Sequence, residues 1–499
     1  MSDDGVMIGF SDRPELLRLD RANRHGLVAG ATGTGKTVTL QILAQGFSDA
    51  GVPVFAADVK GDLSGIGAAG APNEKALARA AAMNLTLRPT AAPVVFWDLF
   101  GQEGHPIRAT VSEMGPLLLS RMLDLNEVQE GVMSVVFRAC DDEKLELLDL
   151  KDLRAALAFA SEHSAELGAQ YGNVSEATVA TIQRKLLVLE DQGGGNIFGE
   201  PALQLRDLMR TDPSGRGYVN LLAADKLITS PSLYATFLLW LMSELFEELP
   251  EVGDPEKPKL VFFFDEAHLL FRDAPKPLLE KVEQVVRLIR SKGVGVYFIT
   301  QNPADIPETV LGQLGNRIEH ALRAYTPVEQ RGLKAAADSF RPNPAFDTAT
   351  AIQELGVGEA LVSVLDEKGA PTMVQKTTIR PPDSRMGPVT PAERAAVMAA
   401  SPVHGLYDQT LDRESAYEQL KARAAPPPVA AAPAPTPPSA PWGEPPEAAP
   451  RASGRMGMGE AFARSMLRTI GSQVGREIVR GVLGGLVASS RGSGRRRRY

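Results

Sequence analysis

Residues 30–37 decide the fold, and they read Gly30-Ala31-Thr32-Gly33-Thr34-Gly35-Lys36-Thr37. This stretch matches the phosphate-binding pattern GxxxxGK[ST] at every fixed position. The apolar run Gly26-Leu-Val-Ala29 before it predicts a buried strand, and apolar residues at helical spacing over 38–46 predict a helix. A strand, a glycine-rich turn and a helix N-terminus together aim backbone N–H groups at an anion. The sequence therefore predicts a nucleotide-binding α/β fold.

Each part of this P-loop (residues 30–37) has an expected role. The glycines let the backbone wrap closely around phosphates, so the whole loop is expected to bind the nucleotide. Lys36 is expected to reach the β- and γ-phosphates, and the Thr37 hydroxyl to bind Mg²⁺. The expected cofactors are therefore ATP and Mg²⁺.

An acidic pair follows a second apolar run, Leu260-Val-Phe-Phe-Phe-Asp265-Glu266. The run predicts a central strand that ends beside the P-loop, with Asp265 placed to hold Mg²⁺ through water or Thr37. Glu266 is expected to orient the attacking water as a general base. The alternative, a strand that ends in a solvated turn, is weakened by the complete P-loop.

Two further polar residues are expected at strand ends on the same rim. Gln301, in Phe298-Ile-Thr-Gln301-Asn-Pro303, is a candidate sensor of the γ-phosphate, or else it caps the loop before the proline. Asp58 ends the predicted strand 52–57. It could support the metal or the water, and a purely structural turn fits it equally well.

Arginines downstream of Gln301 are candidates for stabilising transition-state charge. Residues 316–323 suggest a strand, in which Arg317 and Arg323 would point to the same face. If they reach an active site, we expect it to be that of a neighbouring subunit. The alternative is a pair of surface arginines that bind Glu319 or Glu329.

Bulk composition narrows the class of protein. The 499 residues suggest two or three structural units, and 44% hydrophobic content allows a large core. One cysteine, Cys140, excludes an intrachain disulfide framework and is expected to be buried. The acidic N-terminus does not resemble a signal peptide, and the apolar run 234–242 is too short to span a bilayer. We therefore expect a cytoplasmic protein.

The composition changes along the chain. We expect a first core part with the P-loop, a helical insertion, and a second core part that includes an antiparallel pair at 359–365 and 372–378. A helical extension, an unfolded Pro/Ala-rich linker and a C-terminal helix with a basic tail are expected to follow. The corresponding ranges are 1–110, 111–215, 216–385, 386–423, 424–455 and 456–499.

Charge is distributed unevenly. From Arg451 to Tyr499 there are 11 arginines and two glutamates, a net charge of +9. Because the whole chain carries −8, the other 450 residues carry −17. The tail could contact nucleic acid, an anionic membrane or a protein partner, could self-associate, or could simply keep the chain soluble.

These elements, in this order, resemble the HerA/FtsK superfamily of ring-forming ATPases, and specifically the HerA-like bacterial ATPases. The matching stretches are 30–37, 58–62, 264–268, 300–307 and 311–317. The resemblance implies a RecA-like core with a mainly parallel sheet, a homo-hexamer, ATP hydrolysis at subunit interfaces and translocation along double-stranded DNA. It also implies that Arg323, rather than Arg317, is the arginine that acts in the active site of a neighbouring subunit. The chain departs from the pattern because it leaves no room for an N-terminal β-barrel.

Three other classes of protein share part of this pattern. Asp265-Glu-Ala-His268 spells the DEAH box of another helicase superfamily, but Thr300-Gln-Asn-Pro303 replaces its Ser-Ala-Thr element, so His268 is expected only to pack. ABC-type ATPases need a Leu-Ser-Gly-Gly-Gln signature shortly before the acidic strand, and none occurs there. The third class, a nucleotide-dependent assembly or scaffold ATPase that serves a protein partner, stays open.

Overall fold

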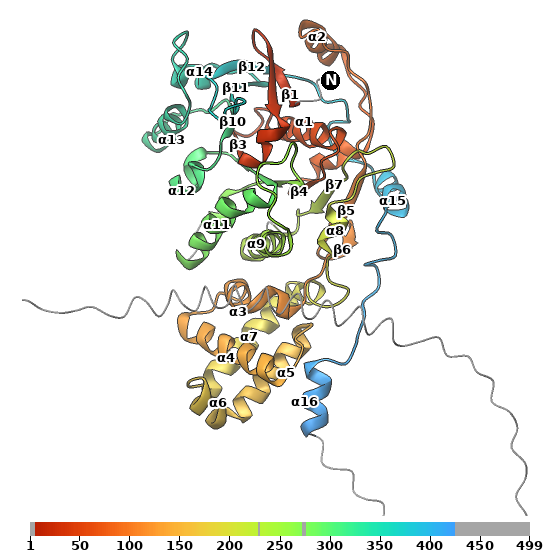
Figure 1. Cartoon of the computed structure of the whole chain (residues 1–499), viewed down its shortest axis with the longest axis vertical. Helices are drawn as coiled ribbons and strands as arrows, with labels where there is room; N and C mark the ends of the chain where they lie inside the picture. The colour runs from red at the N-terminus through yellow and green to blue at the C-terminus, as the bar shows by residue number, and fades with distance from the viewer. Residues whose placement is uncertain (1–4, 228–229, 272–275, 425–499) are drawn as a thin grey trace, which may run out of the picture. The chain divides into compact units, whose positions relative to one another are not determined.

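The structure is a computed structural model that describes residues 5–227, 230–271 and 276–424 (Figure 1). Apart from Ala424, the linker expected at 424–455 lies outside these residues, as do the helix and basic tail expected at 456–499.

Twelve strands of the described chain form one sheet, in the order β2-β1-β12-β11-β10-β3-β9-β8-β4-β7-β5-β6. Their bounds are β1 (Gly5–Phe10), β2 (Pro14–Arg18), β3 (Gly26–Ala29), β4 (Val54–Asp58), β5 (Val94–Asp98), β6 (His105–Pro106), β7 (Val219–Ala223), β8 (Leu260–Phe264), β9 (Val294–Thr300), β10 (Asn316–His320), β11 (Glu359–Ser363) and β12 (Gln375–Ile379).

The sheet is mainly parallel, as predicted. Every pairing from β10 to β6 is parallel, whereas β11, β12, β1 and β2 add an antiparallel edge. The predicted antiparallel pair is confirmed by β11 and β12. Strand β9 pairs with both β3 and β8 and so separates the P-loop strand from the strand that precedes Asp265. The acidic pair nevertheless lies close enough to Lys36 of the P-loop to interact with its charge, as predicted.

Both faces of the sheet are buried, because alternate residues of each central strand enter different cores. Val28 faces the core that includes α1 (Lys36–Asp49), whereas Leu27 and Ala29 face the core that includes α9 (Pro231–Glu248) and α11 (Lys276–Ile289). Figure 1 shows α9 and α11 together on one side of the strands. A sheet covered on both faces explains why its strands are uninterrupted apolar runs.

Smaller helices complete the core. They are α2 (Glu74–Ala82), α8 (Leu205–Leu208), α10 (His268–Phe271), α12 (Glu308–Leu311), α13 (Pro327–Asp338) and α14 (Thr348–Glu354).

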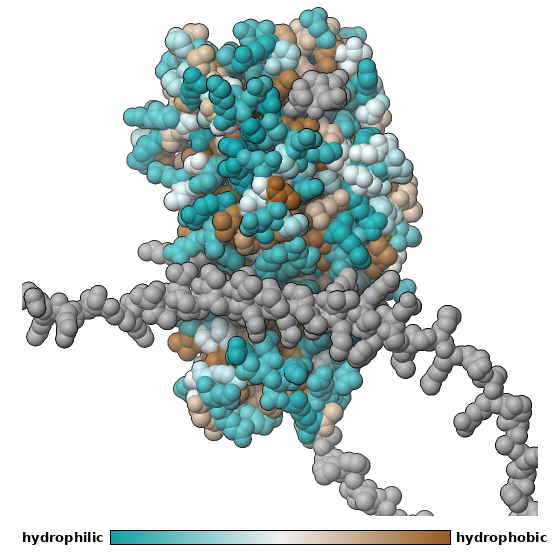
Figure 2. Space-filling model, viewed as in Figure 1, coloured by the Kyte–Doolittle hydropathy of each residue, from teal (hydrophilic) through white to brown (hydrophobic). Residues whose placement is uncertain are grey.

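The visible surface of the described residues is mainly hydrophilic, with scattered apolar side chains (Figure 2). Among the helices described, none combines the length and the apolar character needed to cross a bilayer. Cys140 is buried, as predicted, and burial raises the pKa of its thiol to about 12.

Five consecutive α-helices follow β6 in the chain. Their bounds are α3 (Val111–Met122), α4 (Glu127–Glu143), α5 (Leu150–Glu162), α6 (Ser164–Gln170) and α7 (Glu176–Asp191). The first three begin at capping boxes, in which Thr110, Asn126 and Asp149 each accept a hydrogen bond from a backbone N–H of the first turn. We call these five helices the helical bundle.

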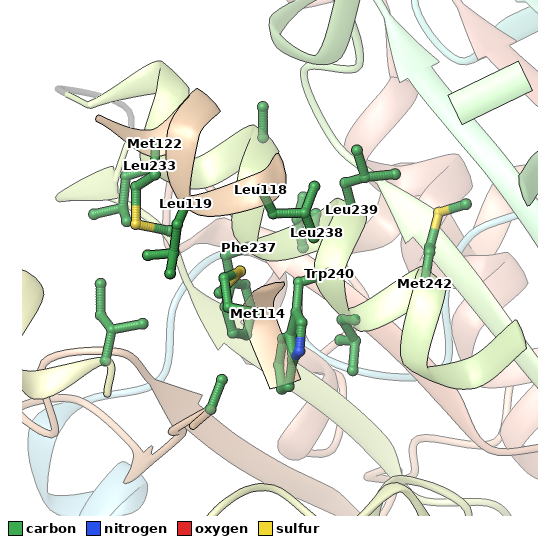
Figure 3. Close-up of a cluster of buried hydrophobic side chains, with 14 of the residues drawn as sticks. Met114, Leu118, Leu119, Met122, Leu233, Phe237, Leu238, Leu239, Trp240 and Met242 are labelled. Carbon is green, nitrogen blue, oxygen red and sulfur yellow. The ribbon is translucent and has the colours of Figure 1, made fainter. Parts of the chain in front are cut away.

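Helix α9 is the most apolar helix of the core and packs against α3 (Figure 3). Leu118, Leu119 and Met122 of α3 lie with Leu233 and Phe237 of α9 in this contact. Because the other side of α9 faces the sheet, the helix is buried nearly all round.

The C-terminal part of the described chain connects the core with the helical bundle. Helix α15 (Pro391–Ala399) packs on β5, and α16 (Ala416–Ala424) packs on α5. Between them, Arg108 Nη1 donates to the Tyr407 carbonyl over 2.9 Å. At the start of α16, Ser415 Oγ donates to buried Asp152 over 2.5 Å. Residues 391–424, which are distant in sequence from both, therefore contact the core and the helical bundle and link them.

Candidate functional site

The P-loop joins the end of β3 to the start of α1. Gly30 has φ +142° and Gly35 has φ +122°, values that residues with a Cβ rarely adopt. A Cβ on Gly30 would also lie 2.5 Å from the Cβ of His320. Glycine is therefore required here both by the backbone conformation and by the strand beside the loop.

Lys36 lies inside this loop. Its Nζ donates to the carbonyls of Gly30 and Ala31 over 2.6 and 3.0 Å. Burial lowers the pKa of Lys36, and the carboxylate of Glu266 partly opposes that effect. Thr37 is exposed in the first turn of α1. An ammonium group enclosed by a glycine-rich loop at a helix N-terminus fits nucleotide phosphates.

The acidic pair follows β8 directly. Burial, together with the negative charge of Glu266, raises the pKa of Asp265 to about 7. The half-buried Asp265 carboxylate and the exposed Thr37 hydroxyl are hard oxygen ligands of the kind that Mg²⁺ takes together with phosphate oxygens and water. Asp265 and Thr37 therefore fit a magnesium site. The described residues hold no cluster of three or more metal-binding side chains, and such a magnesium site needs none.

Three side chains approach the carboxylate of Glu266. Lys60 Nζ lies 3.5 Å from Oε1, and His268 Nδ1 lies 3.4 Å from Oε2. Gln301 Nε2 donates to Oε2 over 3.4 Å. The side chain of Glu266 is only 8% exposed, so its orientation is determined by these neighbours.

Gln301 also contacts the P-loop. Thr32 Oγ1 donates to its Oε1 over 3.4 Å. Since β9 separates β3 from β8, the end of β9 lies between the P-loop and Glu266. This position is suitable for a residue that senses the terminal phosphate, and that role stays a prediction.

Asp58 has a different environment from Glu266. Its Oδ2 accepts a hydrogen bond from the backbone N–H of Ser64 over 3.0 Å, and burial raises the pKa of its carboxyl to about 6. It thus stabilises the turn that follows β4, while its role at the metal stays a prediction. Sequence reasoning missed Lys60, two residues further on, although the matched stretch 58–62 contains it.

The two candidate arginines do not share a strand. β10 ends at His320, so the expectation of a strand over 316–323 is wrong at its C-terminal end. Arg317 donates to the carbonyls of Leu314, Ser339 and Leu311 over 2.8 to 3.1 Å. Arg323 is exposed, and in the described part of the chain it has no hydrogen bond or ion pair.

The expected pairing with Glu329 is also absent from the described residues. The carboxylate of Glu329 accepts hydrogen bonds from the backbone N–H groups of Tyr325 and Thr326 and caps α13. Glu319 is fully buried, which raises the pKa of its carboxyl. Lys36 and Arg317 lie close enough to oppose that rise.

His320 packs against the P-loop, and sequence reasoning did not single it out as a site residue. One ring nitrogen, Nε2, lies 2.9 Å from Thr39 Oγ1 in α1, and Nδ1 lies 3.0 Å from the Glu359 carbonyl. Burial lowers the pKa of His320 to about 4, so the ring is neutral near pH 7. Its position on β10, beside β3, could be found only once the strand order was known.

The family described as helicase HerA-like C-terminal matches residues 6–491. A probable helicase of Methanocaldococcus jannaschii is 29% identical over 125 residues, which make up 24% of this chain and 22% of that relative. The chain therefore matches about a fifth of the length of that relative.

Solved structures show weaker likenesses. The bacterial conjugative coupling protein TrwBdeltaN70 is 14% identical with a TM-score of 0.49, covering 78% of this chain and 91% of that one. VirB4 of Thermoanaerobacter pseudethanolicus is also 14% identical with a TM-score of 0.49, covering 78% of this chain and 98% of that one. Because the family match spans nearly the whole sequence and includes the complete P-loop and acidic pair, the chain belongs to the helicase HerA-like C-terminal family and is a P-loop ATPase.

Proposed function

We propose that this ATPase assembles into a homo-hexameric ring that uses ATP hydrolysis to move along double-stranded DNA. The observation that carries the proposal is the contrast between the two arginines. Arg317 is bound to backbone carbonyls of its own chain, whereas Arg323 is exposed and without a partner among the described residues. Arg323 follows two residues after Ala321, whose carbonyl accepts a hydrogen bond from the P-loop N–H of Ala31 over 2.9 Å. An unpaired arginine in this place supports a site completed by a neighbouring subunit.

The residues of one chain supply the other parts of the reaction. Thr37 and Asp265 would hold Mg²⁺, which when bound neutralises charge on the phosphate oxygens. Lys36 binds the phosphates. Glu266 orients the attacking water and accepts its proton, and Gln301 holds the Glu266 carboxylate relative to the P-loop. Asp58 keeps the turn after β4 in place and could support the water.

Membership of a helicase-like family and similarity to a probable helicase support DNA as the substrate. We place the activity in the cytoplasm, where ATP and duplex DNA meet.

We also propose that residues 1–110 and 216–385 form the motor core and that 111–215 form an insertion in it. The basic tail is expected to contact nucleic acid, an anionic membrane or a protein partner.

Displacement of a third DNA strand from a duplex tests the proposal. A motor that moves along duplex DNA removes a triplex-forming strand from its path in an ATP-dependent manner. We expect displacement by the wild type with ATP, and none with a non-hydrolysable analogue or with Glu266→Gln. Hydrolysis of ATP without displacement, on duplexes of any length, would refute translocation.

The charge of the helical bundle favours a second candidate, a ring that acts on a protein partner. Residues 111–191 contain 15 acidic and seven basic residues. Such a surface repels phosphates and attracts basic segments of proteins. ATP hydrolysis that does not respond to DNA would support this candidate over the motor.

A further inference from the structure

A tyrosine of α9 contacts the backbone of the acidic pair. The hydroxyl of Tyr234 donates to the main-chain carbonyl of Asp265 over 2.8 Å. Tyr234 is 1% exposed, and burial raises the pKa of its hydroxyl well above the usual value. The hydroxyl is therefore a permanent hydrogen-bond donor to this carbonyl.

The carbonyl of Asp265 belongs to the peptide that leads into Glu266. Glu266 has φ +49°, a left-handed conformation that is uncommon for residues other than glycine. The N–H of the same peptide donates to Asp265 Oδ1 over 2.9 Å. Both polar ends of the peptide are thus held, one by Asp265 itself and one by Tyr234. Holding this peptide fixes the direction in which the Glu266 side chain leaves the backbone.

The same end of α9 is bound to the helical bundle. Ser232 Oγ donates to the Arg121 carbonyl in the last turn of α3 over 3.1 Å. One turn of helix therefore contacts α3 through Ser232 and the acidic pair through Tyr234. The apolar contact between α9 and α3 continues along both helices (Figure 3).

We propose that Tyr234 is a positioning residue for ATP hydrolysis, holding the Asp265–Glu266 peptide and coupling it through α9 to the helical bundle. The proposal rests on the ATP-hydrolysis part of the proposed function and is independent of DNA. A partner bound to the bundle would act on Glu266 through this hydroxyl.

Tyr234→Phe in the full chain removes only the hydroxyl. We expect kcat for ATP hydrolysis to fall roughly tenfold, because the variant loses one buried hydrogen bond to the peptide that orients Glu266. We expect KM to stay within about twofold of wild type. Tyr297→Phe is the matched control. Tyr297 is equally buried, its hydroxyl donates to the Ala22 carbonyl over 3.0 Å, and it lies beside Gly26 at the start of β3. We expect a similar loss of thermal stability in both variants but unchanged kcat in Tyr297→Phe. Equal kcat values in the two variants would overturn the positioning role.

Amide hydrogen exchange tests the coupling. With a non-hydrolysable ATP analogue and Mg²⁺, we expect exchange in α3 to change in the wild type and in Tyr297→Phe, but not in Tyr234→Phe. The same change in all three proteins, or no change in the wild type, would overturn the coupling. Neither experiment contains DNA, so both results are valid even if the protein does not move along DNA. Conversely, a negative result for Tyr234 would not contradict the proposed translocation.

Discussion

Gln301 bridges the P-loop and Glu266, accepting a hydrogen bond from Thr32 Oγ1 and donating one to the Glu266 carboxylate, each over 3.4 Å. Both bonds are long, as in catalytic sites that tighten when substrate binds. The bridge exists because β9 lies between β3 and β8. A change at the P-loop can therefore reach Glu266 through a single side chain.

Gln301→Ala breaks this bridge. We expect kcat to fall about tenfold while ATP affinity stays near wild type, because Lys36 and the loop amides still bind the phosphates. Steady-state kinetics and binding of a fluorescent nucleotide check this. A variant with normal kcat would show that Gln301 only caps its loop.

Glu266→Gln keeps the size of the side chain and removes the base. We expect ATP to bind, but hydrolysis to slow by about 10² or more. Lys36→Ala is the contrasting variant, because it should lose nucleotide binding itself. Turnover at the wild-type rate by Glu266→Gln would exclude this carboxylate from the mechanism.

The two arginines should respond differently to truncation. Arg317→Ala leaves three carbonyls without their donor, so we expect a loss on the order of 3 kcal/mol in the free energy of unfolding. Arg323→Ala should leave thermal stability unchanged and slow hydrolysis by about 10³, the effect of losing an arginine in trans. Thermal denaturation and ATPase assays on both variants separate the roles. Equal stability losses would contradict this assignment.

Mixing inactive subunits tests where Arg323 acts. Arg323→Ala retains an intact P-loop, and Lys36→Ala retains an intact arginine. If the arginine acts across subunits, a mixture of the two should recover part of the wild-type activity. A mixture as inactive as either parent would assign Arg323 to its own chain or to no catalytic role.

Stability should fall in mild acid because of His25. Burial lowers the pKa of His25 to about 4, against 6.5 for the free side chain, so the folded state prefers the neutral ring. The unfolded state therefore binds the proton first, and stability present above pH 6.5 is lost as pH falls towards 4. Between pH 7 and 5.5, His25 should account for about 1 kcal/mol of that loss. Urea denaturation of His25→Gln should show a smaller pH dependence than the wild type, and an unchanged dependence would contradict the assignment.

Local patterns predicted much of this fold. The P-loop, the strand before Asp265 and the antiparallel hairpin of β11 and β12 each depend on neighbouring residues, and each was located from sequence. The start of α5 at Leu150 is likewise set locally, because Asp149 caps the helix and the buried leucines before it lie in a loop.

Long-range pairing was not accessible from sequence. The position of β9 between β3 and β8 depends on how strands far apart in the chain pair. The contacts of Arg317 with the Ser339 carbonyl and of Tyr234 with the Asp265 carbonyl join side chains to backbone atoms, which leave no pattern in the sequence. The charge on Lys60 was visible, but its contact with Glu266 required the adjacent ends of β4 and β8.

The rate of ATP hydrolysis with and without double-stranded DNA, at low and moderate salt, tests the central claim most directly. The proposed motor predicts that DNA stimulates hydrolysis by the wild type, that stimulation weakens as salt rises, and that Glu266→Gln abolishes it. Hydrolysis that is robust and identical with and without DNA at every salt concentration would contradict the motor and leave an ATPase that acts on a protein partner.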